Sequence, residues 1–273
     1  MSDMMSDLYG NYENSLTHNE LFGWHRMLMN GRSDLSYIGN YRNDDDPMQI
    51  VSGRLDRPKI HFEAPPSRMV QKEMDRFVTW FNSTAKGEKN VLPPLVRAGI
   101  AHLYFVTIHP FEDGNGRIAR ALVIKSLSQS LGKPLFTSFS TVIHKGKKDY
   151  YNVLEASNKT NDITNWLIYF SKTLISAQNY TQQLIEFLIT KAKLFESLKG
   201  KINSRQEKVL IRIFKEGVEG FKGGLSAENY ISISGATRPT ATRDLNDLVA
   251  KNALIKTGEL KGSRYHLNLK FFC

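Results

Sequence analysis

The chain has 273 residues, of which 41% are hydrophobic and 23% charged, and its formal net charge is +10. This size and composition fit one large or two smaller globular domains and exclude a disordered chain. Cys273 is the only cysteine, so the chain can form neither an intramolecular disulfide nor a cysteine-based metal site.

The first residues lack the basic start and apolar core of a signal peptide, and no apolar run has the length of a membrane span. We therefore expect a cytoplasmic protein without membrane contact. From Asn19 onward, helical periodicity dominates, with breaks at Gly31, 39–46 and 87–94. This pattern predicts an almost entirely helical first domain, which ends in a long helix over about 163–199.

Residues 109–120 read His-Pro-Phe-Glu-Asp-Gly-Asn-Gly-Arg-Ile-Ala-Arg. An apolar stretch over 95–108 precedes the run, and apolar residues at helical spacing follow it, so we predict a loop between two helices. Gly114 and Gly116 allow a tight turn that aims backbone N–H groups at one point, at the beginning of the second helix. Arg117 and Arg120, three residues apart, can then clamp further anionic oxygens. Together with a histidine base and a carboxylate, this arrangement indicates a nucleotide phosphate site.

The run matches the Fic family signature His-x-Phe-x-Asp/Glu-Gly-Asn-Gly-Arg-x-x-Arg at every fixed position. The resemblance extends from about His25, through the Gly-Asn-Tyr-Arg turn at 39–42 and the Pro65-Pro66 segment, to Tyr150-Tyr151 and Trp166. It implies the Fic fold, which is mainly α and all-helical apart from a short β-hairpin flap. It also implies a protein adenylyltransferase, a nucleotidyltransferase that moves AMP from ATP to a Ser, Thr or Tyr hydroxyl of a target protein.

The resemblance assigns roles to individual residues of this chain. His109 would be the general base, and Asp113 would hold Mg²⁺ against the α- and β-phosphates. Gly114, Asn115, Gly116, Arg117 and Arg120 would bind the phosphates. Phe111 would anchor the loop in the core, and Glu112 stands at a variable position without an assigned role.

Two further segments resemble parts of the family. The extended runs 48–51 and 59–63 would form the flap, in which Ile60, His61, Phe62 and Glu63 contact the target through their backbone. Tyr150, Tyr151 and Asn158 match residues that line the nucleotide pocket. For the two tyrosines, plain core packing is an equally good interpretation, because buried aromatic residues are common on helix faces.

Other functions stay open at this point. A Fic-type loop also serves the transfer of UMP or phosphocholine, or the removal of AMP, because the transferred group depends on how the nucleotide lies. Alternatively, the chain is a DNA-binding regulator with a Fic sensor domain. Many Fic enzymes carry an inhibitory helix with the pattern Ser/Thr-x-x-x-Glu-Gly/Asn, which we do not find here. We therefore expect a protein that lacks an N-terminal inhibitory segment or is restrained by an inhibitory partner, and a homodimer is left open.

The sequence divides into a Fic domain over residues 1–200, with its core at about 19–175, and a smaller domain over 204–273. The second part resembles a winged helix-turn-helix: three short apolar-faced helices precede two extended pieces near Gly258 and Gly262. Residues 201–273 hold 8 Lys and 5 Arg against 7 acidic residues, so DNA is a candidate partner. Asp244 and Asp247 on the candidate recognition helix weaken that case, and packing, dimerisation or partner binding is the alternative use of this domain.

Overall fold

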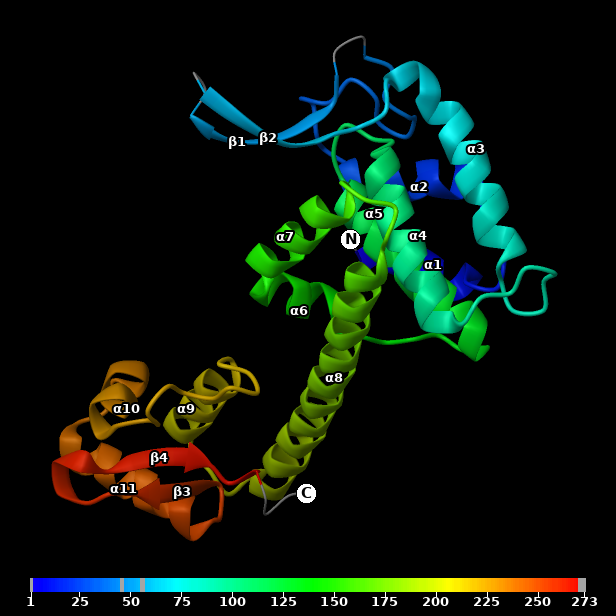
Figure 1. Cartoon of the computed structure of the whole chain (residues 1–273). Helices are drawn as coiled ribbons and strands as arrows, with labels where there is room; N and C mark the ends of the chain where they lie inside the picture. The colour runs from blue at the N-terminus through cyan, green and yellow to red at the C-terminus, as the bar shows by residue number, and fades with distance from the viewer. Residues whose placement is uncertain (1, 45–46, 55–56, 270–273) are drawn as a thin grey trace. The chain divides into compact units, whose positions relative to one another are not determined.

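The computed structural model describes residues 2–44, 47–54 and 57–269 and is mainly helical, as predicted (Figure 1). The chain forms two compact units, Met1–Gln178 and Asn179–Cys273. The division falls within helix α8, Thr164–Leu198, which agrees with the long helix expected from the sequence. The domain boundary proposed for residues 200–203 follows the end of this helix and stays a prediction. Among the described residues, no helix is both long and apolar enough to span a membrane.

The first unit contains seven helices before α8 and one hairpin within its described residues. They are α1 Ser2–Asn11, α2 His18–Met29, β1 Gln49–Arg54, β2 Arg57–Glu63, α3 Ser67–Ser83, α4 Pro94–Ile108, α5 Asn115–Leu131, α6 Phe139–Lys145 and α7 Lys147–Ser157. Strands β1 and β2 pair antiparallel, with Gln49 opposite Glu63. They include the predicted flap run 59–63 and all of the run 48–51 except Met48, which precedes β1, and residues 55 and 56 of their connection lie outside the described residues.

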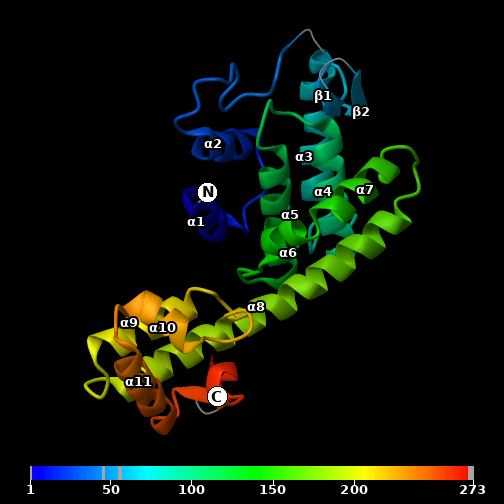
Figure 2. The same cartoon turned by 90° about the vertical axis from the view of Figure 1, so that its left-hand side faces the viewer.

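The helical pair α4 and α5 forms the centre of this unit (Figures 1 and 2). Pro94 begins α4 because its fixed φ suits the first helical position and its missing N–H is not needed there. Gly132 ends α5 in the left-handed conformation. Both helices bury residues on more than one side, so neither is strongly amphipathic: α4 is almost continuously apolar, and α5 also buries polar side chains such as Lys125 and Ser126.

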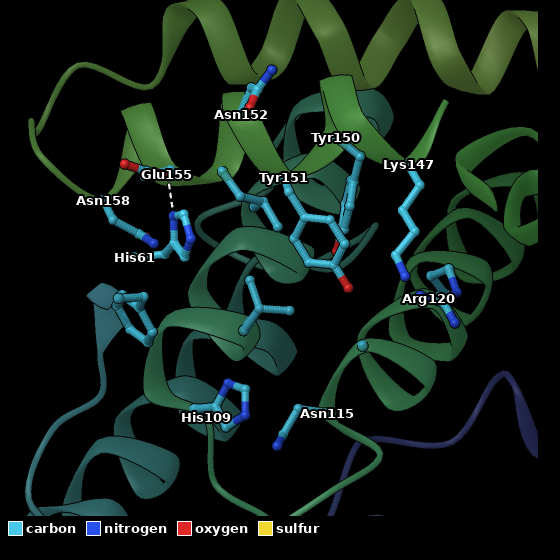
Figure 3. Close-up of a pocket in the computed structure, with 14 residues that line it drawn as sticks. His61, His109, Asn115, Arg120, Lys147, Tyr150, Tyr151, Asn152, Glu155 and Asn158 are labelled. Carbon is cyan, nitrogen blue, oxygen red and sulfur yellow. Dashed lines mark hydrogen bonds and ion pairs between the residues drawn. The ribbon is translucent and has the colours of Figure 1, made fainter. Parts of the chain in front are cut away.

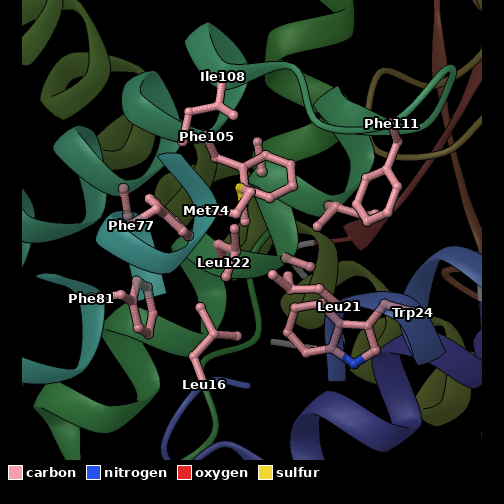
Figure 4. Close-up of a cluster of buried hydrophobic side chains, with 14 of the residues drawn as sticks. Leu16, Leu21, Trp24, Met74, Phe77, Phe81, Phe105, Ile108, Phe111 and Leu122 are labelled. Atoms are coloured by element: carbon pink, nitrogen blue, oxygen red, sulfur yellow. The ribbon is translucent and has the colours of Figure 1, made fainter. Parts of the chain in front are cut away.

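Two hydrophobic clusters hold the pair from different sides. One packs α4 and α5 against α1, α2 and α3 and is shown in Figure 4, where Trp24, Phe77, Phe81 and Phe105 are among the labelled side chains. The other packs α4 and α5 against α6, α7 and α8. The site-bearing loop between α4 and α5 is therefore anchored at both ends by buried helices.

Helix α1 lies before the first helix expected from the sequence. Its Met4 and Leu8, four residues apart, are buried in the first cluster. The Trp24 indole N–H donates a hydrogen bond of 2.8 Å to Asp7 Oδ2. A ten-residue helix is marginal by itself, so tertiary packing decides that this segment is helical.

The second unit contains α9 Ser204–Phe214, α10 Ala227–Ser234, α11 Arg238–Ala250, β3 Leu254–Thr257, the short 3₁₀ helix η1 Leu260–Gly262 and β4 Arg264–Leu267. Capping boxes at Asn203 and Ser226 begin α9 and α10, because each side chain accepts from the N3 backbone amide and the N3 side chain reciprocates. The three helices share one apolar core with the C-terminal part of α8. The elements expected from the sequence are present, and their assignment as a winged helix-turn-helix stays a prediction.

We predict that Phe77→Ala lowers the free energy of unfolding of the first unit by about 3–5 kcal/mol, because it leaves a cavity in the main cluster. The matched control Phe136→Ala removes a ring that is 61% exposed and should change it by less than about 1 kcal/mol. Urea unfolding followed by tryptophan fluorescence measures this unit selectively, since Trp24, Trp80 and Trp166 all lie within it. Equal effects of the two substitutions would contradict the packing described here.

Candidate active site

One pocket of about 520 Å³ gathers most of the residues that the sequence singled out (Figure 3). It is lined by β2, the end of α4, the beginning of α5, and α7. Of the predicted site residues, it brings together His61, Phe62, His109, Asn115, Gly116, Arg120, Tyr150, Tyr151 and Asn158. The other predicted residues, Ile60, Glu63, Asp113, Gly114 and Arg117, lie next to them in the chain but are not among the residues that line it.

His109 is the residue at which α4 ends. It adopts the left-handed conformation with φ 51°, and its N–H donates to the Phe105 carbonyl at 3.1 Å. This turn directs the imidazole into the pocket, where the Phe62 ring lies 6.5 Å from it between ring centres. Burial lowers the pKa of His109 to about 4, and nearby Arg42 adds to this effect. The ring is therefore neutral at pH 7 and able to accept a proton.

The loop from His109 to Asn115 is closed by the Asn115 side chain. Its Oδ1 accepts from the Phe111 N–H at 3.0 Å, and its Nδ2 donates to the Phe111 carbonyl at 2.6 Å. The buried Phe111 ring stacks on His25 with a centroid separation of 4.1 Å and an interplanar angle of 10°. This packing agrees with the expected role of Phe111 as the anchor of the loop. The side-chain amide of Asn115 stabilises the loop through its two hydrogen bonds to Phe111.

The first turn of α5 faces the pocket. Gly114 precedes it with φ 85°, a conformation that a residue with a Cβ adopts only with strain, and its N–H donates to Asp113 Oδ1 at 2.6 Å. The first amides of a helix have no intrahelical partner, so this end of α5 offers N–H groups to an anion. Arg120, one turn further, lines the pocket and donates through Nε to Ser140 Oγ at 3.0 Å. Burial lowers the pKa of Arg120.

The Asp113 carboxylate is held by two guanidinium groups. Its Oδ2 accepts from Arg32 Nη1 at 2.9 Å and from Arg117 Nη2 at 3.2 Å. Burial alone would raise the pKa of Asp113, but the Gly114 amide and the two arginines outweigh it and lower that pKa. The side chain is 43% exposed and ionised, so its charge is available to a cation that displaces an arginine.

Glu112 has a structural partner that the motif does not reveal. Its carboxylate accepts from the backbone N–H groups of Ser36 at 3.2 Å and Tyr37 at 2.6 Å. The same segment carries Arg32, which also pairs with Asp34. Glu112 and Asp113 therefore fasten the segment after α2 onto the motif loop.

Two buried side chains outside the motif also fix its geometry. Arg42 donates to the His109 carbonyl at 2.8 Å, to Ser67 Oγ at 2.8 Å and to the Pro65 carbonyl. His25 Nδ1 accepts from the Gly39 N–H at 2.9 Å, so its Nε2 is placed to donate to the Asp113 carbonyl at 3.2 Å. One sequence signal pointed to both residues, since His25 and the 39–42 turn lie in the segment that resembles the Fic family.

Helix α7 forms the opposite wall. Tyr150 is buried and its hydroxyl lies 3.3 Å from His102 Nε2, whereas Tyr151 is 49% exposed. Tyr150 thus packs in the core and lines the pocket at once, so the two interpretations of this residue do not exclude each other. Asn158 Oδ1 accepts from Thr107 Oγ1 at 3.3 Å. Lys147, which the sequence did not single out, adds a cation to this wall, with Nζ 5.8 Å from the Tyr151 ring centre.

The hairpin contacts α7 beside the pocket. His61 Nδ1 lies 2.7 Å from Glu155 Oε2, and this pair is drawn in Figure 3. Ile60 is 52% exposed, and Glu63 accepts from Gln49 Nε2 within the hairpin at 2.8 Å. The adjacent residues His61 and Phe62 therefore both line the pocket, whereas Ile60 and Glu63 on either side of them are exposed.

Comparison with known proteins shows what the motif-bearing part of this chain is similar to. The Fic/DOC family model matches residues 15–127, which include the whole motif. "Protein adenylyltransferase Fic" of Nematostella vectensis is 29% identical over 157 residues, covering 52% of this chain and 35% of that protein. The protein of the same name from Drosophila mojavensis is 38% identical over 87 residues, covering 32% and 16%. The matched part thus spans about a third or less of these relatives.

Solved structures show the same fold. A Fic family protein from Desulfovibrio desulfuricans has a TM-score of 0.50 at 24% identity, covering 97% of this chain and 73% of that one. A Fic-1 structure from Caenorhabditis elegans has a TM-score of 0.50 at 22% identity, covering 66% and 49%. Tyr150, Tyr151 and Asn158 lie beyond the segment that the family model matches, and folding brings them to the motif.

We predict that the His109 imidazole of the ligand-free protein titrates near pH 4 and not near 6.5, because its charged form is desolvated. Since the folded state favours the neutral ring, this group lowers the free energy of unfolding as the pH falls from about 6.5 towards 4. NMR titration of the histidine Cε1–H signals measures the pKa, with His109→Ala identifying the resonance. A midpoint between pH 6 and 7 would refute the burial described here.

Proposed function

Because residues 15–127 match the Fic/DOC family model, we propose that the chain is a protein adenylyltransferase, which transfers AMP from ATP to a Ser, Thr or Tyr hydroxyl of a target protein. The observation that carries the proposal is the shared pocket of His109 and the first turn of α5. A proton acceptor and an anion-binding helix end lie there within reach of one substrate. The relatives named protein adenylyltransferase support the same activity.

The pocket suits a nucleoside triphosphate. Its volume of about 520 Å³ lies in the range typical of small-molecule sites. Asn115 and Gly116 would bind phosphate oxygens through their backbone N–H groups, since the Asn115 side-chain amide is committed to Phe111. The Gly114 N–H, which donates to Asp113 Oδ1, would join them once that bond opens. Arg117 and Arg120 would neutralise the β- and γ-phosphates. Tyr150, Tyr151 and Asn158 would line the remainder of the nucleotide site.

Asp113 is the residue that would hold Mg²⁺. A magnesium ion bound together with a nucleotide commonly takes one or two carboxylates and fills its other positions with phosphate oxygens and water, so a single ionised, half-exposed aspartate fits. When bound, the ion would neutralise charge on the phosphates. Both arginines pair with Oδ2, so a cation bound through that oxygen would compete with Arg32 and Arg117.

The reaction would proceed as an in-line displacement. Neutral His109 accepts the proton of the target hydroxyl, and the hydroxyl oxygen forms a bond to the α-phosphorus. The bond between the α-phosphorus and the bridging oxygen breaks, and that oxygen leaves with pyrophosphate. Arg117, Arg120 and the α5 amides stabilise the negative charge that builds on the leaving group. The protein would thus act mainly by positioning the two substrates and by stabilising the negative charge of the transition state.

The hairpin would present the target. Strands β1 and β2 form a two-stranded sheet, so an edge of each is open to an added strand. A target segment paired through its backbone with Ile60, His61, Phe62 and Glu63 would lie beside His109, since Phe62 is already close to that ring. Backbone pairing specifies an extended segment and little about its side chains.

We predict that His109→Ala lowers the rate of AMP transfer by at least about 100-fold, because it removes the general base. Binding of a non-hydrolysable ATP analogue should stay within a few-fold of the wild type, as measured by calorimetry. The control is His144→Ala on α6, an exposed histidine that is not among the residues lining the pocket. Undiminished transfer by the His109 variant would remove this residue as the base.

Mass spectrometry of proteins modified in a lysate identifies the transferred group. With ATP and Mg²⁺ supplied, the wild type should add AMP to hydroxyl side chains, and the His109→Ala form should not. Addition of UMP or phosphocholine, or loss of AMP from a premodified protein, would replace the proposed donor with another Fic-type chemistry. Modified peptides also name the target and the hydroxyl residue.

We predict that Arg32→Gln strengthens divalent-cation binding in the presence of ADP, because Asp113 then loses one competing guanidinium. Mn²⁺ titration followed by electron paramagnetic resonance measures this without turnover. The matched control Arg76→Gln removes an arginine that pairs with Glu73 on α3 and should leave the cation affinity unchanged. A weaker Mn²⁺ affinity in Arg32→Gln than in the control would contradict competition at Asp113.

A further inference from the structure

The second unit carries an exposed helix surface that takes no part in the proposed nucleotide site. Helix α11 buries Ala241, Leu245 and Leu248 in the core and exposes Thr242, Arg243 and Asn246. Thr242 and Arg243 lie four and three positions before Asn246, so the three exposed residues share one face of the helix. The side chains on this face, which we call the α11 outer face, are basic or amide and hydroxyl groups.

The two carboxylates of α11 are engaged elsewhere. Asp244 is buried and accepts hydrogen bonds from Tyr230 Oη at 2.9 Å and Arg205 Nε at 3.0 Å. Asp247 accepts from Gln206 Nε2 at 2.7 Å and from Lys251. Both carboxylates thus pair with donors on α9, α10 or the last turn of α11. Their negative charge is therefore offset within the protein and does not argue against contact with a phosphate backbone.

The neighbouring elements have the order of a winged helix-turn-helix. Gly235, in the left-handed conformation with φ 73°, connects α10 to α11. Strands β3 and β4 pair antiparallel after α11. Leu225, which precedes α10, forms an isolated antiparallel β-bridge with Tyr265 of β4. The hairpin lies against α11 (Figures 1 and 2). In this arrangement the second helix of the pair enters the major groove of DNA.

From these observations we propose that the second unit binds duplex DNA, with the α11 outer face in the major groove and the β3–β4 hairpin beside it. Residues 201–273 carry a net charge of +6, which complements the phosphate backbone. Arg243 can pair with guanine or a phosphate, and Asn246 with adenine. The major groove of B-form DNA admits a helix, whereas that of A-form RNA is too narrow, so the ligand is DNA. The proposal is independent of the nucleotide site.

The test uses the full chain and a fluorescein-labelled 30-base-pair duplex of random sequence. Fluorescence anisotropy between 50 and 200 mM NaCl should show binding whose logarithmic affinity falls linearly with the logarithm of salt. Arg243→Glu should weaken binding at least about tenfold and reduce the salt slope by about one, if Arg243 contacts one phosphate. Asn246→Ala should leave that slope unchanged and lower the preference for sequences selected from a random duplex library.

The matched control is Lys208→Glu, the same reversal of charge at an exposed position of α9 outside the α11 outer face. It should weaken binding by much less than Arg243→Glu. Thermal unfolding checks that both variants are folded, and both positions are exposed, so we expect unchanged midpoints. Absence of duplex binding by the wild type at 50 mM NaCl, equal effects of the two charge reversals, or equal affinity for a duplex RNA of the same sequence would overturn the proposal.

Discussion

The side chain of Asn115 is the interaction on which the candidate site depends. By hydrogen-bonding both backbone groups of Phe111, it closes the loop between α4 and α5 into a single shape. Phe111 is buried against His25, so the loop cannot shift without opening the core. His109 at one end of the loop and the α5 amides at the other are consequently held in one relation to each other. A reaction that relies on position needs this rigidity more than it needs any additional reactive group.

The charges around this rigid loop are balanced against one another before any nucleotide is bound. Asp113 neutralises Arg32 and Arg117, and Glu112 fixes the backbone of the segment that carries Arg32. A triphosphate and its cation would replace these internal partners with external ones. The arginines would then turn from the carboxylate to the phosphates while the carboxylate turns to the cation. In such an exchange, neither the two arginines nor the carboxylate would be left without an oppositely charged partner.

The motif and most of the helices are predictable because their signals are local, whereas α1 depends on tertiary packing. Glycines, a proline at the beginning of α4 and the fixed order of polar residues in 109–120 each act over a few positions. The contacts of Arg42 with His109 and of Glu112 with Tyr37 join segments more than sixty residues apart, and no spacing rule reaches so far. Asp244 is different: Ala241, Leu245 and Leu248 already define a buried face, and helical periodicity places Asp244 on it.

The low pKa of His109 poses a problem that the site itself resolves. A base with a pKa near 4 is always free to accept a proton at pH 7, but it is a weak base for a hydroxyl group. Its weakness arises from burial and from the positive charge of Arg42, without a closely placed anion to offset them fully. Triphosphate oxygens bound at the α5 N-terminus would supply such an anion, and a negative charge within a few ångströms raises the pKa of an imidazole. Nucleotide binding would thus strengthen the base at the moment when the substrate is in place. In the absence of nucleotide, the same ring would stay neutral and weakly basic, so under the proposed function His109 would become an effective base only when the nucleotide is bound.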